Sequence, residues 1–185
     1  MQYPVEHLPR FVESFVDFQS LSEHTKVCAC RHCGRVGTLI GHGFLRGYAE
    51  QSSTRIARAK RFFCSNRGRR RGCGRTDSSF IADFVPLFTI TTLTMWSLFS
   101  RMSKAHSVVS TSQAAQFPLC SRSAYRIANR LKCASLHWRS WLAELGTSLS
   151  STASRPLAQL HDQLLAALGA LPFSKWQLRA QSSLF

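Results

Sequence analysis

The amino-acid sequence predicts an α+β fold, in which a small antiparallel β unit is followed by a mainly helical region. The first observation is that residues 24–83 are rich in Cys, Gly and Arg and contain short runs of strand-forming residues. The second is that residues 84–145 carry apolar side chains at helical spacing. A chain of 185 residues is long enough for one ordinary domain or two small ones. The predicted strands are Lys26–Ala29, Val36–Ile40, Phe44–Ala49 and Arg55–Cys64.

The flanking segments are shorter and less regular. Residues 1–23 predict an amphipathic lead-in, because three phenylalanines recur at spacings of four and three. Residues 146–154 are rich in Ser and Thr after a glycine, which indicates a linker. In residues 155–185 a last helix is expected, with Ser154 as its N-cap, Pro156 in its first turn and its end near Gly169. The three phenylalanines are Phe11, Phe15 and Phe18.

Four cysteines have the pattern of a structural metal site. Cys30 and Cys33 form a C-x-x-C sequence followed by Gly34, and two thiolates at this spacing can reach one tetrahedral ion. Cys64 and Cys73 supply a second pair, and Cys73 is again followed by glycine. Eight residues separate the second pair, where two to four are usual, so this pair departs from the common pattern. We expect one structural Zn²⁺ held by these four thiolates.

The choice of ligands is not unique from sequence alone. Cys28, His32 and His42 lie close enough in the sequence to replace one of the four. We rank them lower, because Cys28 falls in a predicted strand and His32 lies between two ligands. Cys120 and Cys133 fall in the helical region and are expected to be core residues.

Nothing at the start of the sequence resembles a signal peptide, and no apolar stretch reaches the roughly 18 residues that a membrane span requires. We therefore expect a cytoplasmic protein that does not bind a membrane, with cysteines that are reduced.

The charge of the chain predicts an anionic partner. There are 24 Lys and Arg against 9 Asp and Glu, a net charge of +15. Nucleic acid is the commonest partner for such a surplus, and an anionic membrane surface is the main alternative. No acidic residue occurs between Gln51 and Thr76 or between Phe84 and Ala143. The basic residues of the first region, which we expect to contact phosphates, are Arg55, Arg58, Lys60, Arg61, Arg67, Arg69, Arg70, Arg71 and Arg75.

The second basic region contains a candidate recognition helix that begins at Ser121. Ile127, Leu131, Ala134 and Trp138 share one face of this helix, and Arg122, Arg126 and Arg130 share another, about a quarter turn away. Earlier helices over Met95–Met102 and Ser107–Gln116 would complete a helix-turn-helix with the basic helix last. Its candidate base-reading residues are Arg122, Arg126, Asn129 and Arg130. The alternative is an ordinary helical bundle whose arginines are only solvated.

Several of these motifs occur together in a known group. The order is C-x-x-C-G, then Gly41-His42-Gly43 followed by Arg46, then Arg61-Phe62-Phe63-Cys64, then Gly72-Cys73-Gly74-Arg75-Thr76. This order resembles the zinc ribbons of bacterial insertion-sequence proteins. The resemblance extends over about residues 26–80, and more loosely over 89–133. It implies a ribbon joined to a helix-turn-helix that recognises the ends of a mobile element.

The function expected from this resemblance is sequence-specific binding of duplex DNA, as a transposase-associated accessory factor or repressor. An enzyme is not expected, because phosphoryl transfer needs clustered carboxylates, whereas Asp77 and Asp83 are six apart and the remaining acids are scattered. The alternatives are a ribbon that binds RNA or bridges proteins, and a DNA-binding fragment of a transposase. A separately encoded transposase and a second copy of the chain are the protein partners that this interpretation allows.

Overall fold

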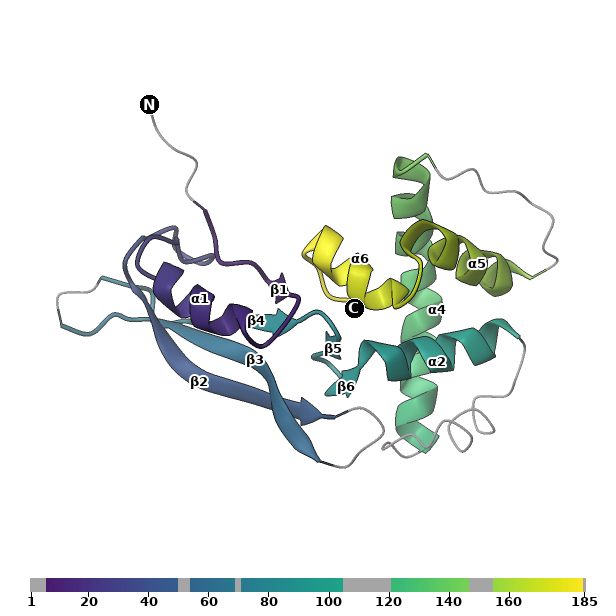
Figure 1. The fold of residues 1–185 in the computed structure, drawn as a ribbon, viewed down its shortest axis with the longest axis horizontal. Helices are drawn as coiled ribbons and strands as arrows, with labels where there is room; N and C mark the ends of the chain where they lie inside the picture. Colours follow the sequence, from purple (N-terminus) through teal and green to yellow (C-terminus); the bar gives the residue numbers. More distant parts are fainter. Residues whose placement is uncertain (1–5, 50–53, 69–70, 105–120, 147–154, 185) are drawn as a thin grey trace.

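The computed structural model describes residues 6–49, 54–68, 71–104, 121–146 and 155–184, and it confirms the predicted α+β class. A four-stranded sheet with one helix forms the first part of the molecule, and a group of helices forms the second (Figure 1). We refer to these parts as the sheet unit and the helical unit. Each has its own cluster of buried apolar side chains.

The sheet has the strand order β1-β4-β3-β2. Strands β2 (Leu39–Tyr48), β3 (Arg55–Cys64) and β4 (Thr76–Ile81) pair antiparallel, and β1 (Phe11–Val12) pairs parallel with β4. The bounds of β3 are those predicted. The predicted strands over 36–40 and 44–49 are largely one strand, β2, which is irregular between Gly41 and Phe44.

In the first 30 residues one predicted strand is absent, and the lead-in is only partly helical. The predicted strand Lys26–Ala29 is mostly a turn, in which only Ala29 forms isolated bridges. The three spaced phenylalanines do not share one helical face, because helix α1 (Asp17–His24) begins only after Phe15. Phe11 instead lies in β1, and Phe15 is 46% exposed.

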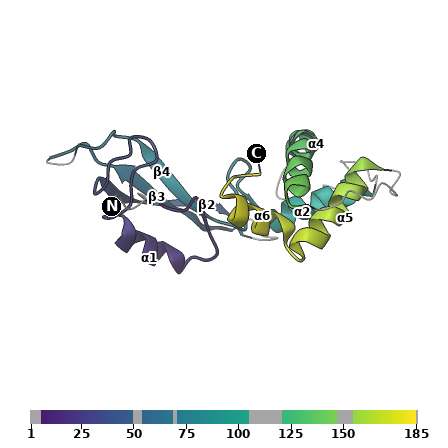
Figure 2. The ribbon, with the colours of Figure 1, turned by 90° about the horizontal axis from the view of Figure 1, so that it is seen from above.

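The lead-in nevertheless contributes to the core of the sheet unit. Phe18 and Leu21 of α1 are buried, and both belong to the apolar cluster that includes Leu39 of β2 and Phe62 of β3. Figure 2 shows α1 lying along one side of the sheet. The side chains on this face are therefore covered by the lead-in.

The helical unit begins with a short hairpin that the helix pattern did not reveal. Strands β5 (Phe84–Val85) and β6 (Ile90–Thr91) pair antiparallel and lead into α2 (Thr92–Ser103), whose first turn is capped by the Thr91 side chain. Helices α4 (Ser121–Glu144), α5 (Pro156–Leu168) and α6 (Pro172–Ala180) follow. The predicted helix over 107–116 lies outside the described residues.

The end of α5 was predicted correctly and its start nearly so. Gly169 is its C-cap, with a φ of 66° that suits glycine. Arg155 occupies the N-cap position, and Ser154 lies outside the described residues. The sequence did not indicate α6.

Helix α6 joins the two units, and both views place it between the sheet and α4 (Figures 1 and 2). The amide of Gln177 is buried and donates to the carbonyl oxygens of Ala82, at 2.8 Å, and Phe84, at 3.1 Å. Just after the helix, Oε1 of Gln181 accepts the backbone N–H groups of Arg10 and Phe11, and its Nε2 donates to the Phe11 carbonyl. These bonds hold the end of the described chain against β1.

Candidate metal centre and basic surfaces

The four predicted cysteines meet at one end of the sheet unit, where their sulfur atoms lie within 4.8 Å of one another. Sγ of Cys30 lies 3.8 Å from Sγ of Cys73, and Sγ of Cys33 lies 3.7 Å from Sγ of Cys64. A tetrahedral zinc with Zn–S bonds of about 2.3 Å would separate its sulfur ligands by about 3.8 Å. The four cysteines could therefore hold one metal ion with little rearrangement.

The first pair belongs to a tight turn. The N–H of Gly34 donates to the Cys30 carbonyl at 2.8 Å, and the N–H of Cys30 donates to the Arg35 carbonyl at 3.0 Å. Gly34 has a φ of 69°, a conformation that residues with a side chain rarely adopt. The N–H of His32 also lies 3.4 Å from the Cys30 sulfur. The turn therefore directs both backbone and sulfur atoms toward the site.

The second pair repeats this turn in spite of its long spacing. The N–H of Gly74 donates to the Cys64 carbonyl at 2.9 Å, and the N–H of Cys64 donates to the Arg75 carbonyl at 2.8 Å. The N–H of Gly72 donates to the Ser65 carbonyl at 2.8 Å, so the chain returns after residue 71 to the place that it left. Without residues 66–71 the order would be Cys64-Ser65-Gly72-Cys73-Gly74, which is C-x-x-C-G.

This return of the chain accounts for the unusually long spacing between Cys64 and Cys73. It also requires glycine at position 72, where a Cβ atom would lie 2.3 Å from the Ser65 carbonyl oxygen and 2.7 Å from the Cys64 sulfur. The residues between Ser65 and Gly72 are thus an insertion into a regular pair of ligands.

Two hydrogen bonds favour the thiolate of Cys64, the form that binds metals. The Thr38 hydroxyl donates to the Cys64 sulfur at 3.1 Å, and the N–H of Cys73 donates to it at 3.2 Å. Burial raises the pKa of the Cys64 thiol, but these hydrogen bonds, together with those from the Cys30 and Cys33 side chains, outweigh burial and lower the pKa to about 7. Sequence reasoning did not identify Thr38. This residue precedes β2 and contacts Cys64, at the end of β3, across 26 positions of sequence.

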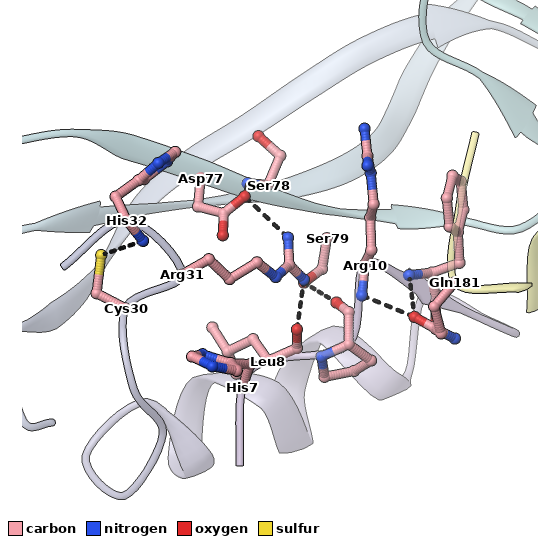
Figure 3. A network of polar contacts seen from close by, with 12 residues as sticks. His7, Leu8, Arg10, Cys30, Arg31, His32, Asp77, Ser78, Ser79 and Gln181 are labelled. Carbon is pink, nitrogen blue, oxygen red and sulfur yellow. Dashed lines mark hydrogen bonds and ion pairs between the residues drawn. The ribbon is translucent and has the colours of Figure 1, made fainter. Parts of the chain in front are cut away.

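Arg31, which lies between the ligands of the first pair, fixes the site to the rest of the sheet unit (Figure 3). Its Nη1 forms an ion pair with Oδ1 of Asp77 at 3.0 Å, and its Nη2 donates to the Leu8 carbonyl. Burial lowers the pKa of Arg31, while Asp77 partly opposes this effect. Arg31 thereby links the turn that carries Cys30 and Cys33 to β4 and to the lead-in. Sequence reasoning did not predict this link.

The alternative ligands lie outside the cluster of sulfur atoms. Cys28 is buried in the apolar core of the sheet unit, where burial and the nearby Glu6 raise the pKa of its thiol. His32 and His42 are exposed, and the ring of His42 lies 5.7 Å from that of Phe63. The expectation that Cys133 is a core residue is wrong: it lies on the exposed side of α4. Cys120 lies outside the described residues.

The structure removes Arg58 from the set of available phosphate contacts. Its side chain is only 7% exposed, and its Nη1 lies 2.7 Å from Oδ2 of Asp83. Its Nε and Nη2 also donate to the Tyr48 carbonyl. Position 58 falls where the pairing of β2 with β3 shifts register, which turns this side chain inward. Arg58 is therefore a structural residue.

Most other basic residues of the sheet unit face solvent to some extent. The guanidinium of Arg55 lies over the ring of Tyr48, 5.0 Å from its centroid, and the Lys60 ammonium lies over Phe44 at 4.3 Å. Lys60 and Arg61 are half-buried. Arg69 and Arg70 lie outside the described residues. The exposed members are Arg55, Arg67, Arg71 and Arg75.

Helix α4 separates basic from apolar side chains as predicted. Ile127, Leu131 and Trp138 are fully buried in the core of the helical unit, and Ala134 packs against it. The predicted base-reading residues all lie on the exposed surface of the same helix: Arg122, Arg126, Asn129 and Arg130.

Comparisons with protein-family models, with curated proteins and with solved structures found no match to this chain. In the part of the chain that the structure describes, none of the helices has the length and apolar character needed to cross a bilayer.

Proposed function

We propose that this chain is a zinc-binding protein that binds duplex DNA in a sequence-specific manner. The observation that carries the proposal is the exposed row of Arg122, Arg126 and Arg130 on α4, whose opposite face is buried in the core. A helix anchored in this way presents its basic side chains at fixed positions, as a groove-binding helix must. Four thiolates at tetrahedral spacing are a ligand set that suits zinc.

The two units would make different contacts with DNA. The major groove of DNA admits an α-helix, and arginine and asparagine are the side chains that most often form paired hydrogen bonds with guanine and adenine. The exposed arginines of the sheet unit would contact phosphates, which positions the protein without reading sequence. The resemblance to insertion-sequence ribbons supports a role as an accessory factor or repressor of a mobile element.

The ion pairs formed by two acidic residues near the middle of the chain agree with a non-enzymatic role. Asp77 and Asp83 form ion pairs with Arg31 and Arg58, so each already has a cationic partner. The proposal does not rest on a cluster of carboxylates of the kind that binds catalytic metal ions.

The proposal is tested by selection from a library of random duplexes with the purified, zinc-loaded chain. A shared sequence among the selected duplexes, bound more tightly than structured RNA, is the expected result. A preference for RNA over every selected duplex would favour the RNA-binding alternative.

Replacing Arg126 with alanine is expected to relax sequence preference at one or two base positions. A paired arginine–guanine contact discriminates against a wrong base by about 1–3 kcal/mol, whereas its loss leaves phosphate contacts in place. The measurement is the affinity of Arg126→Ala for a library randomised at each position of the selected site. An equal loss of affinity across the whole library would show that Arg126 neutralises a phosphate. Leu136→Ala is a control on the same helix, because Leu136 is 69% exposed and apolar.

Deleting residues 66–71, which joins Ser65 directly to Gly72, is expected to leave the metal site intact and to weaken DNA binding nonspecifically. The deletion restores the C-x-x-C-G spacing while removing Arg67, Arg69, Arg70 and Arg71. Each lost phosphate contact should reduce the slope of log affinity against log salt by about 0.9. Metal content and salt titrations of binding are the two measurements. An unchanged slope would show that residues 66–71 do not contact DNA. Loss of the metal would show that these residues are needed for the ligand turn and are not an insertion into it.

A further inference from the structure

Three neighbouring cavities lie where the two units meet. The first, of about 320 Å³, lies beside α4 and is lined by Arg126, Arg130 and Cys133 together with Leu87 and Phe88. The second, of about 330 Å³, lies against Arg10, Pro86 and Ser183. The third, of about 320 Å³, lies between α4 and the segment that follows α6, with His137 in its wall.

These cavities adjoin one another because they share lining residues, and we refer to the three together as the groove. Arg130 and Cys133 line both the first and the third, Leu87 lines the first and the second, and Ser183 lines the second and the third. The end of the described chain runs between the sheet and α4 in both views (Figures 1 and 2). Gln177 and Gln181 hold this end in place and so fix the wall of the groove that it forms.

The groove is positively charged. None of the described residues that line it is acidic. Its cations are Arg10 from the lead-in and Arg126 and Arg130 from α4, and all three are exposed. Within the part of the chain that the structure describes, the ion pairs involve other arginines and one histidine, so these three cations have no carboxylate partner there. The charge is therefore available to an anionic ligand.

The dimensions and the apolar lining indicate the form of that ligand. Cavities of this volume are of the size that holds small molecules, so each has room for a single nucleotide unit. Leu87, Phe80 and Pro86 supply apolar surface beside the arginines, a combination that suits bases and phosphates of an unpaired strand. We infer that the groove between α4 and the segment after α6 binds single-stranded nucleic acid. This inference rests on the proposed function, because the groove begins at the same arginines of α4 and would receive a strand that leaves the bound duplex.

The test compares binding of an unstructured oligothymidylate, such as dT12, with binding of the selected duplex by fluorescence anisotropy. Arg10→Glu reverses one charge of the groove, and Cys133→Trp obstructs it without a change of charge. Each is expected to weaken dT12 binding by about tenfold. The matched controls are Arg179→Glu and Leu136→Trp, because both positions are exposed and neither lines the groove. They should leave dT12 binding unchanged.

The outcomes separate this inference from the proposed function. A chain that binds the duplex but not dT12, or whose dT12 binding is equal in the groove variants and their controls, overturns the groove assignment alone. A chain that binds neither probe overturns both. Metal content and far-ultraviolet circular dichroism establish that each variant is folded, and Arg10→Glu keeps the test valid if Cys133→Trp fails this check.

Discussion

Replacing Cys64 with serine is expected to release the metal ion and to unfold the sheet unit. Cys64 is fully buried, and its sulfur accepts hydrogen bonds from Thr38 and Cys73 that favour the thiolate. Serine offers a weaker ligand at the same place. A structural zinc contributes an apparent free energy of about 10–16 kcal/mol in small zinc domains, which equals or exceeds the whole stability of a typical small domain. The metal content should fall from about one ion per chain to nearly none.

The measurements for this variant are metal analysis by mass spectrometry and amide hydrogen exchange of β2, β3 and β4. Cys133→Ser is the matched control, because Cys133 is an exposed thiol on α4, far from the sulfur cluster. It should keep both the metal and the protection of the sheet. A metal-free Cys64→Ser chain whose strands remain protected from exchange would contradict a structural role for the metal.

Replacing Trp138 with alanine is expected to lower the free energy of unfolding of the helical unit by about 3–5 kcal/mol. The Trp138 side chain is fully buried, and its ring centroid lies 4.9 Å from that of Phe173 and 5.7 Å from that of Phe99. Truncation therefore leaves a cavity shared by α2, α4 and α6, which cannot collapse without moving three helices. Urea unfolding followed by circular dichroism gives the loss.

The same variant should retain its metal, because the buried side chains of the two units form separate clusters. Leu136→Ala is the control on the same helix and should change stability by less than about 0.5 kcal/mol, since Leu136 is 69% exposed. Loss of the metal from Trp138→Ala would show instead that the two units unfold as one.

Local signals in the sequence predicted those elements whose structure depends on neighbouring residues. Strand β3 was predicted with its correct bounds, and Ile56, Phe62 and Phe63 are the residues in it that favour an extended chain. Gly169 was recognised as a helix end, because it permits a positive φ. The two cysteine-glycine pairs indicated a metal site, and the structure brings all four of these cysteines together.

Features that depend on distant contacts could not be predicted in this way. The pairing of β1 with β4 joins residues about 70 positions apart, and Phe11 and Val12 are too short a run for a strand to be predicted from sequence. The sequence does not distinguish Arg58 from a surface arginine. The register shift between β2 and β3, which places Arg58 beside Asp83, is visible only in the structure. The insertion at residues 66–71 hid a regular ligand turn, because only the hydrogen bond between Ser65 and Gly72 shows that the chain closes on itself.

The attachment of Gln181 to β1 also affects the order in which this protein can fold. The side-chain amide of Gln181 bonds to the backbone of Arg10 and Phe11 much as a neighbouring strand would, across about 170 positions of sequence. During synthesis the ribosome therefore releases β1 long before the group that completes its hydrogen bonding exists. Until residue 181 emerges, the unpaired side of β1 is a free sheet edge, the kind of surface on which nascent chains associate with one another. A chain that lost the residues after α6 would keep that edge open permanently.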